Sequence, residues 1–485
     1  MVDAGGELVA VHAITVGCAG ERRTGSGSGL SPVRHGTDPG PPNGWIQVRR
    51  RGTRWYATGR SRPRRPRGRH ERGRTAPLDD SRPPRRQARR GVQRRHRPRR
   101  GRRRCARIRR RDVDEGADAG GGEASEITFD DDLPTVSLIS TGGTIASTVD
   151  YRTGAVTAQF DAEDVLRAVP DLAGRANYRG RVVANILSEN MEPAIWRELA
   201  EAVREEIAAG ADGVVVMHGT DTMQYSASAL SFMLDSPVPI VFTGSQRSAD
   251  RPSSDNVMNA VCAVEAAKAD HAETLVCMHA TQSDDACALH RGTRVRKNHT
   301  SRRDAFETVG AAPIGRIDYE AAAEAGADGD AADDAIVWAR EPLPRGEDDD
   351  SVALDPGLDA DVELVKFTPG MDPAAWDYLD GKDGVVIEGT GLGHVHTDLI
   401  PRIEELVDSG TVVAMTSQCL AGRVCDRVYD TGRDLLDAGV VEAGDTLPGT
   451  AKVKLLWALA NRSDPAEAMG RDLAGELTEE SQPWR

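Results

Sequence analysis

The segment TVSLISTGGTIA, residues 135–146, sets the architecture expected for this chain. Its first seven residues are mostly apolar or β-branched, which favours a short buried strand, and the glycines after them favour a turn. An apolar strand followed by Thr, Gly and polar residues returns at GVVVMHGTDTM, residues 213–223, and at PIVFTGSQR, residues 239–247. Open parallel sheets bind ligands at the carboxyl ends of their strands, so these turns are expected to line one edge of a sheet.

Strands and helices alternate along the chain from Pro134. Helices are expected at residues 161–169, 192–210, 221–234 and 253–269, and further strands at 181–187 and 273–280. After a polar, acidic stretch the alternation resumes with strands at 363–369, 384–390 and 411–417 and helices near 372–380, 397–409, 431–437 and 448–461. The predicted fold class is α/β, with two domains of mostly parallel sheets at 134–320 and 362–485, joined by a linker with an inserted loop at 321–361.

The first 112 residues differ sharply from the rest in charge. They contain 32 of the chain's 62 basic residues, all of them Arg, and only 8 of its 76 acids. Arg, Pro and Gly dominate residues 20–112 with little apolar periodicity, so this region is expected to be disordered. Two interpretations stay open: an RNA-binding arm, or a stretch translated in the wrong frame of a GC-rich gene. Residues 113–133 form an acidic linker.

The body after residue 112 holds the other 68 acids but only 30 basic residues, six of them lysines. Concentrated salt would screen the repulsion on such a surface, so a salt-rich cytoplasm is expected; a merely acidic enzyme is the alternative. The seven cysteines show no CxxC pair, which favours buried reduced thiols over disulfides or a zinc site. No apolar run approaches the roughly 20 residues that span a bilayer, and the start lacks a basic signal region.

Hydroxyl and carboxylate side chains gather at the expected strand ends. Thr144 follows Gly142 and Gly143, and Thr220 stands beside Asp221. A threonine nucleophile needs a base or a relay, which a second Thr–Asp pair with a nearby Lys can supply, and glycine backbone N–H groups can stabilise an oxyanion. Each feature alone also fits a tight turn or a helix cap. No phosphate-binding loop, Ser elbow or metal-ligand spacing competes with this interpretation.

The blocks TGGTIAS (141–147) and HGTDTM (218–223) together resemble the two signatures of the asparaginase/glutaminase family. Further blocks resemble the D subunit of the archaeal-type glutamyl-tRNA(Gln) amidotransferase: DYRTGAV (150–156), NILSENMEP (185–193), TGSQRSADRPSSD (243–255), HRGTRVRKNHTSRRDAF (290–306) and TSQCLAGRV (416–424). The resemblance covers roughly residues 134–462. It implies an asparaginase-like fold preceded by a small β-barrel domain, whose strand pattern residues 1–112 do not show.

The resemblance also implies roles for single residues. Thr144 matches the nucleophile, and Tyr151 matches the tyrosine that activates it and closes the site. Thr220, Asp221 and Lys297 match the second Thr–Asp pair and the lysine of its relay. Ser188 and Glu189, together with Asp221, match residues that hold the amino-acid end of the substrate. For Lys297 the alternative is a surface lysine in a basic loop.

As implied by the resemblance, the chain supplies ammonia to a partner E subunit, which forms Gln-tRNA(Gln) from Glu-tRNA(Gln). The chain itself would bind no metal or cofactor, while the E subunit would use ATP and magnesium and make most of the tRNA contacts. A homodimer within a heterotetramer is expected, with no membrane contact. Glutamine and asparagine both remain possible donors. A free-standing L-asparaginase and an RNA-binding scaffold acting through the Arg-rich arm are the rival functions.

Overall fold

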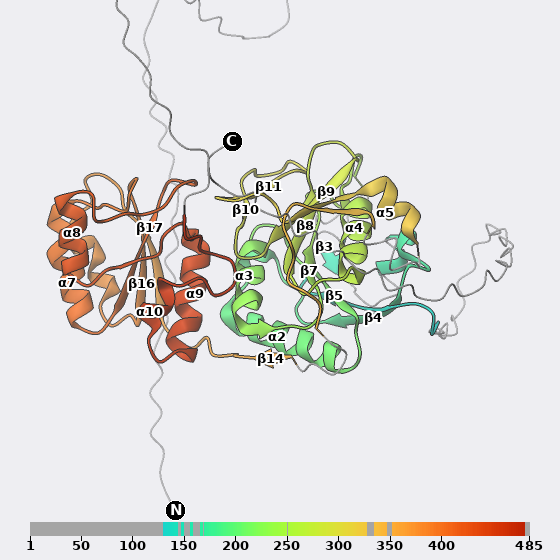
Figure 1. The fold of residues 1–485 in the computed structure, drawn as a ribbon, viewed down its shortest axis with the longest axis horizontal. Coiled ribbons are helices and arrows are strands. Elements are labelled where there is room, and N and C mark those ends of the chain that lie inside the picture. The colour runs from blue at the N-terminus through green and yellow to red at the C-terminus, as the bar shows by residue number, and fades with distance from the viewer. Residues whose placement is uncertain are drawn as a thin grey trace, which may run out of the picture. The chain divides into compact units, whose positions relative to one another are not determined.

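The computed structural model describes residues 130–143, 147–149, 156–158, 165–167, 169–249, 251–326, 334–346 and 352–480. The expectations for the Arg-rich region, and for all of the acidic linker before residue 130, lie outside these ranges. The described residues belong to one compact unit, within which two α/β lobes follow each other along the chain (Figure 1). The α/β class predicted from the sequence is confirmed.

An eight-stranded sheet forms the core of the first lobe, in the order β13-β12-β9-β8-β7-β5-β1-β4. Five strands run parallel: β1 (Thr135–Ser140), β4 (Asn177–Val182), β5 (Gly213–Met217), β7 (Ile240–Thr243) and β8 (Thr274–His279). Three antiparallel strands complete it: β9 (Ala286–Arg291), β12 (Gly315–Asp318) and β13 (Ile336–Trp338). The sheet is therefore mixed, and the three antiparallel strands were not predicted.

Helices cover both faces of this sheet (Figure 1). They are α2 (Pro193–Ala208), α3 (Met223–Met233), α4 (Asn256–Lys268) and α5 (Tyr319–Ala325). Strand β5 shows why both faces must be covered: Val214 and Val216 join the apolar cluster under α2 and α3, while Val215 and Met217 join the one under α4. Because successive side chains of a strand point to opposite faces, the apolar side chains of β5 are buried on both faces of the sheet.

The second parallel strand lies earlier than predicted. It was expected at residues 181–187, but β4 covers Asn177–Val182. An edge strand has only one neighbour, so the polar sequence NYRGRV is tolerated there, and only Tyr178 of its six residues is buried. The apolar residues after it form an irregular segment that leads into a single 3-10 turn, η3 (Ser188–Asn190). The candidate residue Ser188 therefore stands on this turn.

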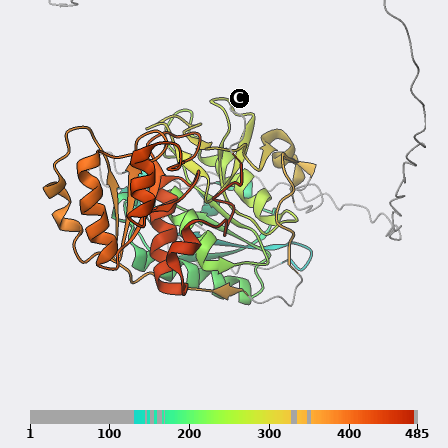
Figure 2. The same cartoon turned by 60° about the vertical axis from the view of Figure 1, so that its left-hand side comes forward.

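The second lobe contains a four-stranded parallel sheet in the order β15-β16-β17-β18. Its strands are β15 (Val362–Lys366), β16 (Gly384–Gly389), β17 (Val412–Ser417) and β18 (Val441–Glu442). The other elements of this lobe are η4 (Pro373–Leu379), η5 (Thr397–Leu399), α7 (Ile400–Asp408), α8 (Asp430–Asp437), α9 (Pro448–Asn461) and α10 (Pro465–Met469). Figure 2 shows the helices of this lobe, in orange and red, from a second side. Helix α9 packs against α3 of the first lobe, with Trp457 stacked on Phe232.

The range 321–361, expected as a linker and insert, also contributes to the first lobe. Most of α5 and the edge strand β13 fall within it, and β14 (Ala353–Leu354) pairs with β6 (Leu234–Asp235). Within the described residues, no helix has the length and apolar character needed to span a bilayer.

The expectation of buried thiols holds for three cysteines and fails for one. Cys262, Cys277 and Cys287 are buried and unpaired, Cys425 is half-buried, and Cys419 is exposed. Cys419 follows the end of β17, in a loop that neither apolar cluster of the second lobe covers. The prediction rested on the absence of a CxxC pair and on the apolar runs around most of the cysteines, and neither observation reports the exposure of a residue in a loop.

Candidate functional site

The turn after β1 packs the backbone of two glycines closely against the backbone of neighbouring segments. Gly142 and Gly143 have φ values of 101° and 100°, in the region that glycine tolerates best. A Cβ atom on Gly143 would lie 2.8 Å from the backbone nitrogen of Gly219, and one on Gly142 would lie 2.5 Å from the carbonyl oxygen of Ile186. The glycines are thus required by close approach as well as by conformation. They place the TGG turn directly beside the HGTDT turn.

Lys297 joins the hydroxyl and the carboxylate of the second turn. Its ammonium group donates to Thr220 Oγ1 at 2.8 Å and to Asp221 Oδ1 at 2.7 Å. Thr220 is buried and the Lys297 side chain is only 10% exposed, while the Asp221 side chain is 67% exposed. The partly buried ammonium can therefore stabilise negative charge on Thr220 from the inside, while Asp221 faces outward. Three of the five predicted catalytic residues thus meet.

A short hairpin positions Lys297. Strand β10 (Val295–Lys297) pairs with β11 (Phe306–Thr308), and the backbone N–H of Lys297 donates to Gln224 Oε1 on α3 at 2.9 Å. Helix α3 begins at Met223, and only Thr222 separates it from the Thr–Asp pair. Lys297 and the Thr220–Asp221 pair are consequently both positioned by the N-terminal end of α3. Lys297 is thus ion-paired and largely buried, and its role in a relay stays a prediction.

Ser188 packs behind the same turn. It is buried, and a Cβ atom on Gly219 would lie 2.6 Å from Ser188 Cβ. Thr222 Oγ1 donates to the Ser188 carbonyl oxygen at 2.8 Å, so η3 is fastened to the start of α3. Glu189 follows on η3 and is exposed. The predicted binding residues therefore lie on an element that is held against the HGTDT turn.

Thr144 and Tyr151 lie outside the described residues. The neighbour of Thr144 in sequence, Gly143, is described and contacts the backbone of His218 and Gly219. The proposed nucleophile and the tyrosine that would activate it therefore remain predictions from the sequence.

His218 is a supporting residue that the sequence reasoning did not single out. Its Nδ1 lies 2.7 Å from the Gly219 carbonyl oxygen and its Nε2 lies 2.8 Å from Ser226 Oγ, which also accepts from Trp196 Nε1. Burial lowers the pKa of His218 to about 4, so the ring is neutral near pH 7. The only sequence signal for His218 was its place in the HGTDTM block, and that block does not distinguish a structural role from a catalytic one.

Asp255 supports the turn TGSQR, residues 243–247, which follows β7. Its carboxylate accepts from the backbone N–H groups of Gln246 and Arg247 at 2.9 to 3.0 Å. Asn259, one turn further along α4, donates to the Gly244 carbonyl oxygen at 2.9 Å. A Cβ atom on Gly244 would lie 3.2 Å from Thr220 Cγ2, so this turn forms a wall against Thr220. Hydrogen bonds to Asp255, which precedes α4, and to Asn259 in its first turn hold this segment against the start of α4.

A metal centre is not formed by the described part of the chain, where no group of three or more His, Cys, Asp or Glu side chains could hold an ion. The described site brings together a hydroxyl, a carboxylate, an ammonium group and backbone dipoles. Such a set suits nucleophilic attack on an amide carbonyl.

Family comparison matches most of the described chain. The family description Asparaginase, N-terminal matches residues 135–326, and the Glutaminase/Asparaginase C-terminal domain matches residues 361–469. The first match contains the TGG turn, the HGTDT turn and Lys297.

Curated relatives carry a more specific name. The chain is 74% identical over 373 residues to the D subunit of glutamyl-tRNA(Gln) amidotransferase from Halobacterium salinarum, covering 77% of this chain and 86% of the relative. It is 51% identical over 356 residues to the protein of the same name from Archaeoglobus fulgidus, covering 73% and 81%. Among solved structures, the thermostable L-asparaginase from Thermococcus kodakarensis matches with a TM-score of 0.61 at 31% identity, covering 71% of this chain and 100% of that one.

Proposed function

This chain belongs to the family of glutamyl-tRNA(Gln) amidotransferase D subunits, and on that premise we propose that it is the ammonia-generating subunit of such an enzyme. The amidohydrolase class follows from its two asparaginase domains. The observation that carries the chemistry is the contact of Lys297 with both Thr220 and Asp221, at 2.8 and 2.7 Å.

The proposed reaction has two covalent steps. The Thr144 hydroxyl attacks the side-chain amide carbon of the substrate, the carbon–nitrogen bond breaks, and the hydroxyl proton leaves with the nitrogen as ammonia. Water then hydrolyses the acyl-threonine and regenerates the hydroxyl. Tyr151 is proposed to activate Thr144, as the resemblance implies.

Thr220, Lys297 and Asp221 are proposed to serve proton transfer. The ammonium group touches both oxygens, so a proton can pass between the Thr220 hydroxyl and the amine while Asp221 stabilises the charged amine. Ser188, Glu189 and Asp221 are proposed to bind the charged amino-acid end of the substrate. The exposed carboxylates of Glu189 and Asp221 support this assignment, because they suit an α-ammonium group.

The family name implies a complex with a second subunit. We propose that a homodimer of this chain joins two E subunits, that the E subunit contacts Glu-tRNA(Gln), and that ATP and magnesium act there. The chain's own reaction would need no cofactor. We further propose a salt-rich cytoplasm as the setting, because the body has 68 acids against 30 basic residues and aminoacyl-tRNA is used in the cytoplasm.

A free-standing L-asparaginase is the second candidate, favoured by the match to the Thermococcus kodakarensis enzyme over 100% of that chain. The two functions differ in their dependence on a partner. Ammonia release from glutamine and from asparagine should be measured for the chain alone and with the E subunit and Glu-tRNA(Gln). A glutaminase rate that rises with both additions supports the amidotransferase assignment. A high asparaginase rate that neither addition changes would assign the chain to the second function.

The nucleophile is tested separately. Thr144→Ala should abolish acyl-enzyme formation in single-turnover experiments, whereas Thr144→Ser should retain part of it. Full amidase activity in Thr144→Ala would overturn the proposed mechanism.

A further inference from the structure

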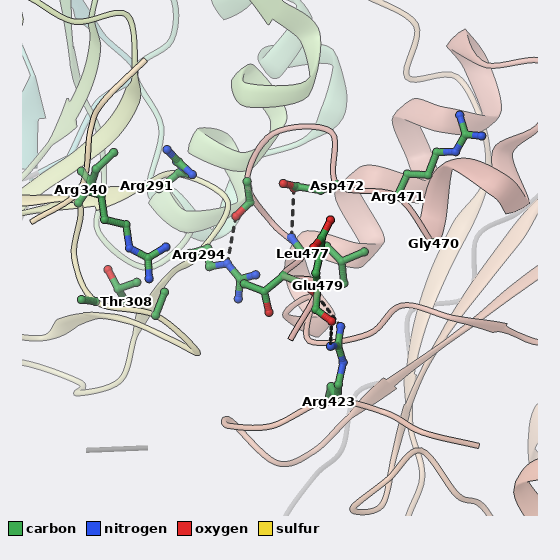
Figure 3. A pocket seen from close by; sticks show the side chains of 15 residues that line it. Arg291, Arg294, Thr308, Arg340, Arg423, Gly470, Arg471, Asp472, Leu477 and Glu479 are labelled. Atoms are coloured by element: carbon green, nitrogen blue, oxygen red, sulfur yellow. Dashed lines mark hydrogen bonds between the residues drawn. The ribbon is translucent and has the colours of Figure 1, made fainter. Parts of the chain in front are cut away.

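A cavity that shares no lining residue with the Thr220–Lys297 site opens between the two lobes (Figure 3). Its volume of about 950 Å³ is within the range of small-molecule sites. One wall comes from the first lobe, at the end of β9 and around the β10–β11 hairpin. The other wall comes from the loop after β17 and from residues 470–479, which follow α10. Five arginines line it: Arg291, Arg294, Arg340, Arg423 and Arg471.

This cluster of guanidinium groups is unexpected, because acidic residues outnumber basic ones in the body of the chain. After residue 112 the chain has 68 acids and 30 basic residues, yet five of those basic residues surround one cavity, with only Asp472 and Glu479 as acidic lining residues. Guanidinium groups bind oxyanions through paired, charge-assisted hydrogen bonds. A concave cluster of them in an acidic protein therefore indicates a site for an anion.

Arg294 gives an independent indication. Its side chain is 4% exposed; Nε donates to the Gly475 carbonyl oxygen at 3.0 Å and Nη1 to Asp445 Oδ2 at 3.1 Å. Its Nη2 is enclosed and has no acceptor among the described residues. A buried donor of a charged group without an acceptor is costly, and here that donor belongs to a guanidinium group in the wall of an arginine-lined cavity.

Two further arginines of the cavity, Arg340 and Arg423, are not engaged in ion pairs with described carboxylates. Arg423 donates to the carbonyl oxygens of Thr478 and Glu479, both at 2.6 Å, and Arg340 is exposed and reaches toward Thr308 in Figure 3. Within the described ranges, neither side chain forms an ion pair. In contrast, Arg291 pairs with Glu273 at 2.6 Å, and Arg471 pairs with Glu467. Arg340 and Arg423 therefore keep charge available for a ligand.

We propose that this cavity binds a small molecule through its phosphate group. Arg294, Arg340 and Arg423 come from three separate segments, and donors from three directions suit a tetrahedral oxyanion better than a planar carboxylate with two oxygens. A nucleic-acid backbone is disfavoured, because the acidic body repels a long polyanion and because the cavity is concave. Inorganic phosphate and the phosphates of a free nucleotide share the recognised chemistry.

Calorimetric titration of the full chain with inorganic phosphate and, separately, with ADP tests the proposal. We expect one site per chain for at least one of them, and comparison of the two affinities identifies the source. Arg340→Ser should weaken binding on the order of tenfold, because it removes a charge-assisted hydrogen bond without touching a structural partner. Arg294→Lys keeps a cation for Asp445, removes Nη2 and should weaken binding at least as much.

Arg197→Ser is the matched control, since Arg197 pairs with Asp359 and does not line the cavity. It should bind both probes as the unaltered chain does. Absence of binding by both probes would overturn the proposal, as would equal binding by Arg340→Ser and Arg197→Ser. A short RNA that binds more tightly than ADP and loses that binding in Arg340→Ser would also overturn it, in favour of a nucleic-acid site.

Discussion

The ammonium group of Lys297 lies 2.8 Å from the Thr220 hydroxyl, although 77 residues separate the two in sequence. Thr220 follows a central parallel strand, whereas Lys297 ends a strand of a hairpin outside the main sheet. The contact exists because that hairpin lies against α3, whose first turn follows Thr220. Catalysis at this site should therefore depend on the hairpin as much as on the sheet.

Lys297→Met should reduce the rate of ammonia release by roughly two to four orders of magnitude, the usual contribution of a general acid or base. The thermal midpoint should change little, because the partner Asp221 is exposed and can be hydrated. Lys366→Met is the control, since Lys366 also forms one ion pair, with Glu388 at 3.0 Å. Equal rates for the two variants would contradict a catalytic role for Lys297.

Gly219→Ala should impair substrate binding more than folding. The new Cβ atom would stand 2.6 Å from Ser188 Cβ and would displace η3, which carries the proposed substrate-binding residues. We expect KM for glutamine to rise at least tenfold, with a smaller change in kcat. Gly470→Ala, whose Cβ atom would meet its nearest atom at 3.7 Å, should leave both constants unchanged. A normal KM in Gly219→Ala would show that η3 does not hold the substrate.

Asp426 should make stability fall with rising pH. It is fully buried, neither carboxylate oxygen has a hydrogen-bond partner among the described residues, and His394 Nε2 lies 3.9 Å from Oδ1. Burial, and secondarily the charge of Glu442, raises the pKa of Asp426 from 3.8 to about 7. The native state therefore keeps a proton that the unfolded chain releases above about pH 4, so this group's contribution declines from there to about pH 7 and is then constant.

Asp426→Asn removes that ionisation. Urea unfolding of both proteins at a series of pH values should show that the variant gains stability relative to the unaltered chain as pH rises from 4 to 7. A constant difference between the two proteins across this window would mean that Asp426 does not carry a proton in the native state.

Lys454→Met should be strongly destabilising. Lys454 and Glu476 are both fully buried as side chains and lie 2.6 Å apart, and Glu476 also accepts from the backbone N–H groups of Leu473 and Ala474. Removing the amine leaves a buried carboxylate without its cation, which costs about 3–5 kcal/mol in the free energy of unfolding. The double variant Lys454→Met/Glu476→Gln should recover part of this loss in chemical denaturation, since no charge then stays buried.

Lys382→Met provides the comparison for an exposed pair, because Lys382 contacts Asp361 at the surface. Its unfolding transition should be close to that of the unaltered chain. A loss as large as that of Lys454→Met would argue against burial as the cause.

Local patterns predicted the elements that carry the strand-end turns. β1, β5 and β7 occur within two residues of their expected positions, because continuous apolar runs between turn residues have few alternatives in a parallel sheet. Strand β4 was misplaced because its sequence is polar, as an edge position allows. The antiparallel strands β9, β12 and β13 were missed because short strands outside a strand–helix alternation have a weak local signal.

The sequence by itself determined the α/β class, the two lobes, the family and the residue types at the strand ends, since these depend on periodicity and on short motifs. Only the tertiary structure decided that Lys297 meets Thr220, that Ser188 lies behind Gly219, that the Asp426 carboxylate is buried with no hydrogen-bond partner among the described residues, and that arginines from three segments share one cavity. The physical reason is that burial and pairing of polar groups depend on which elements pack together. Positions tens of residues apart carry no local record of that packing.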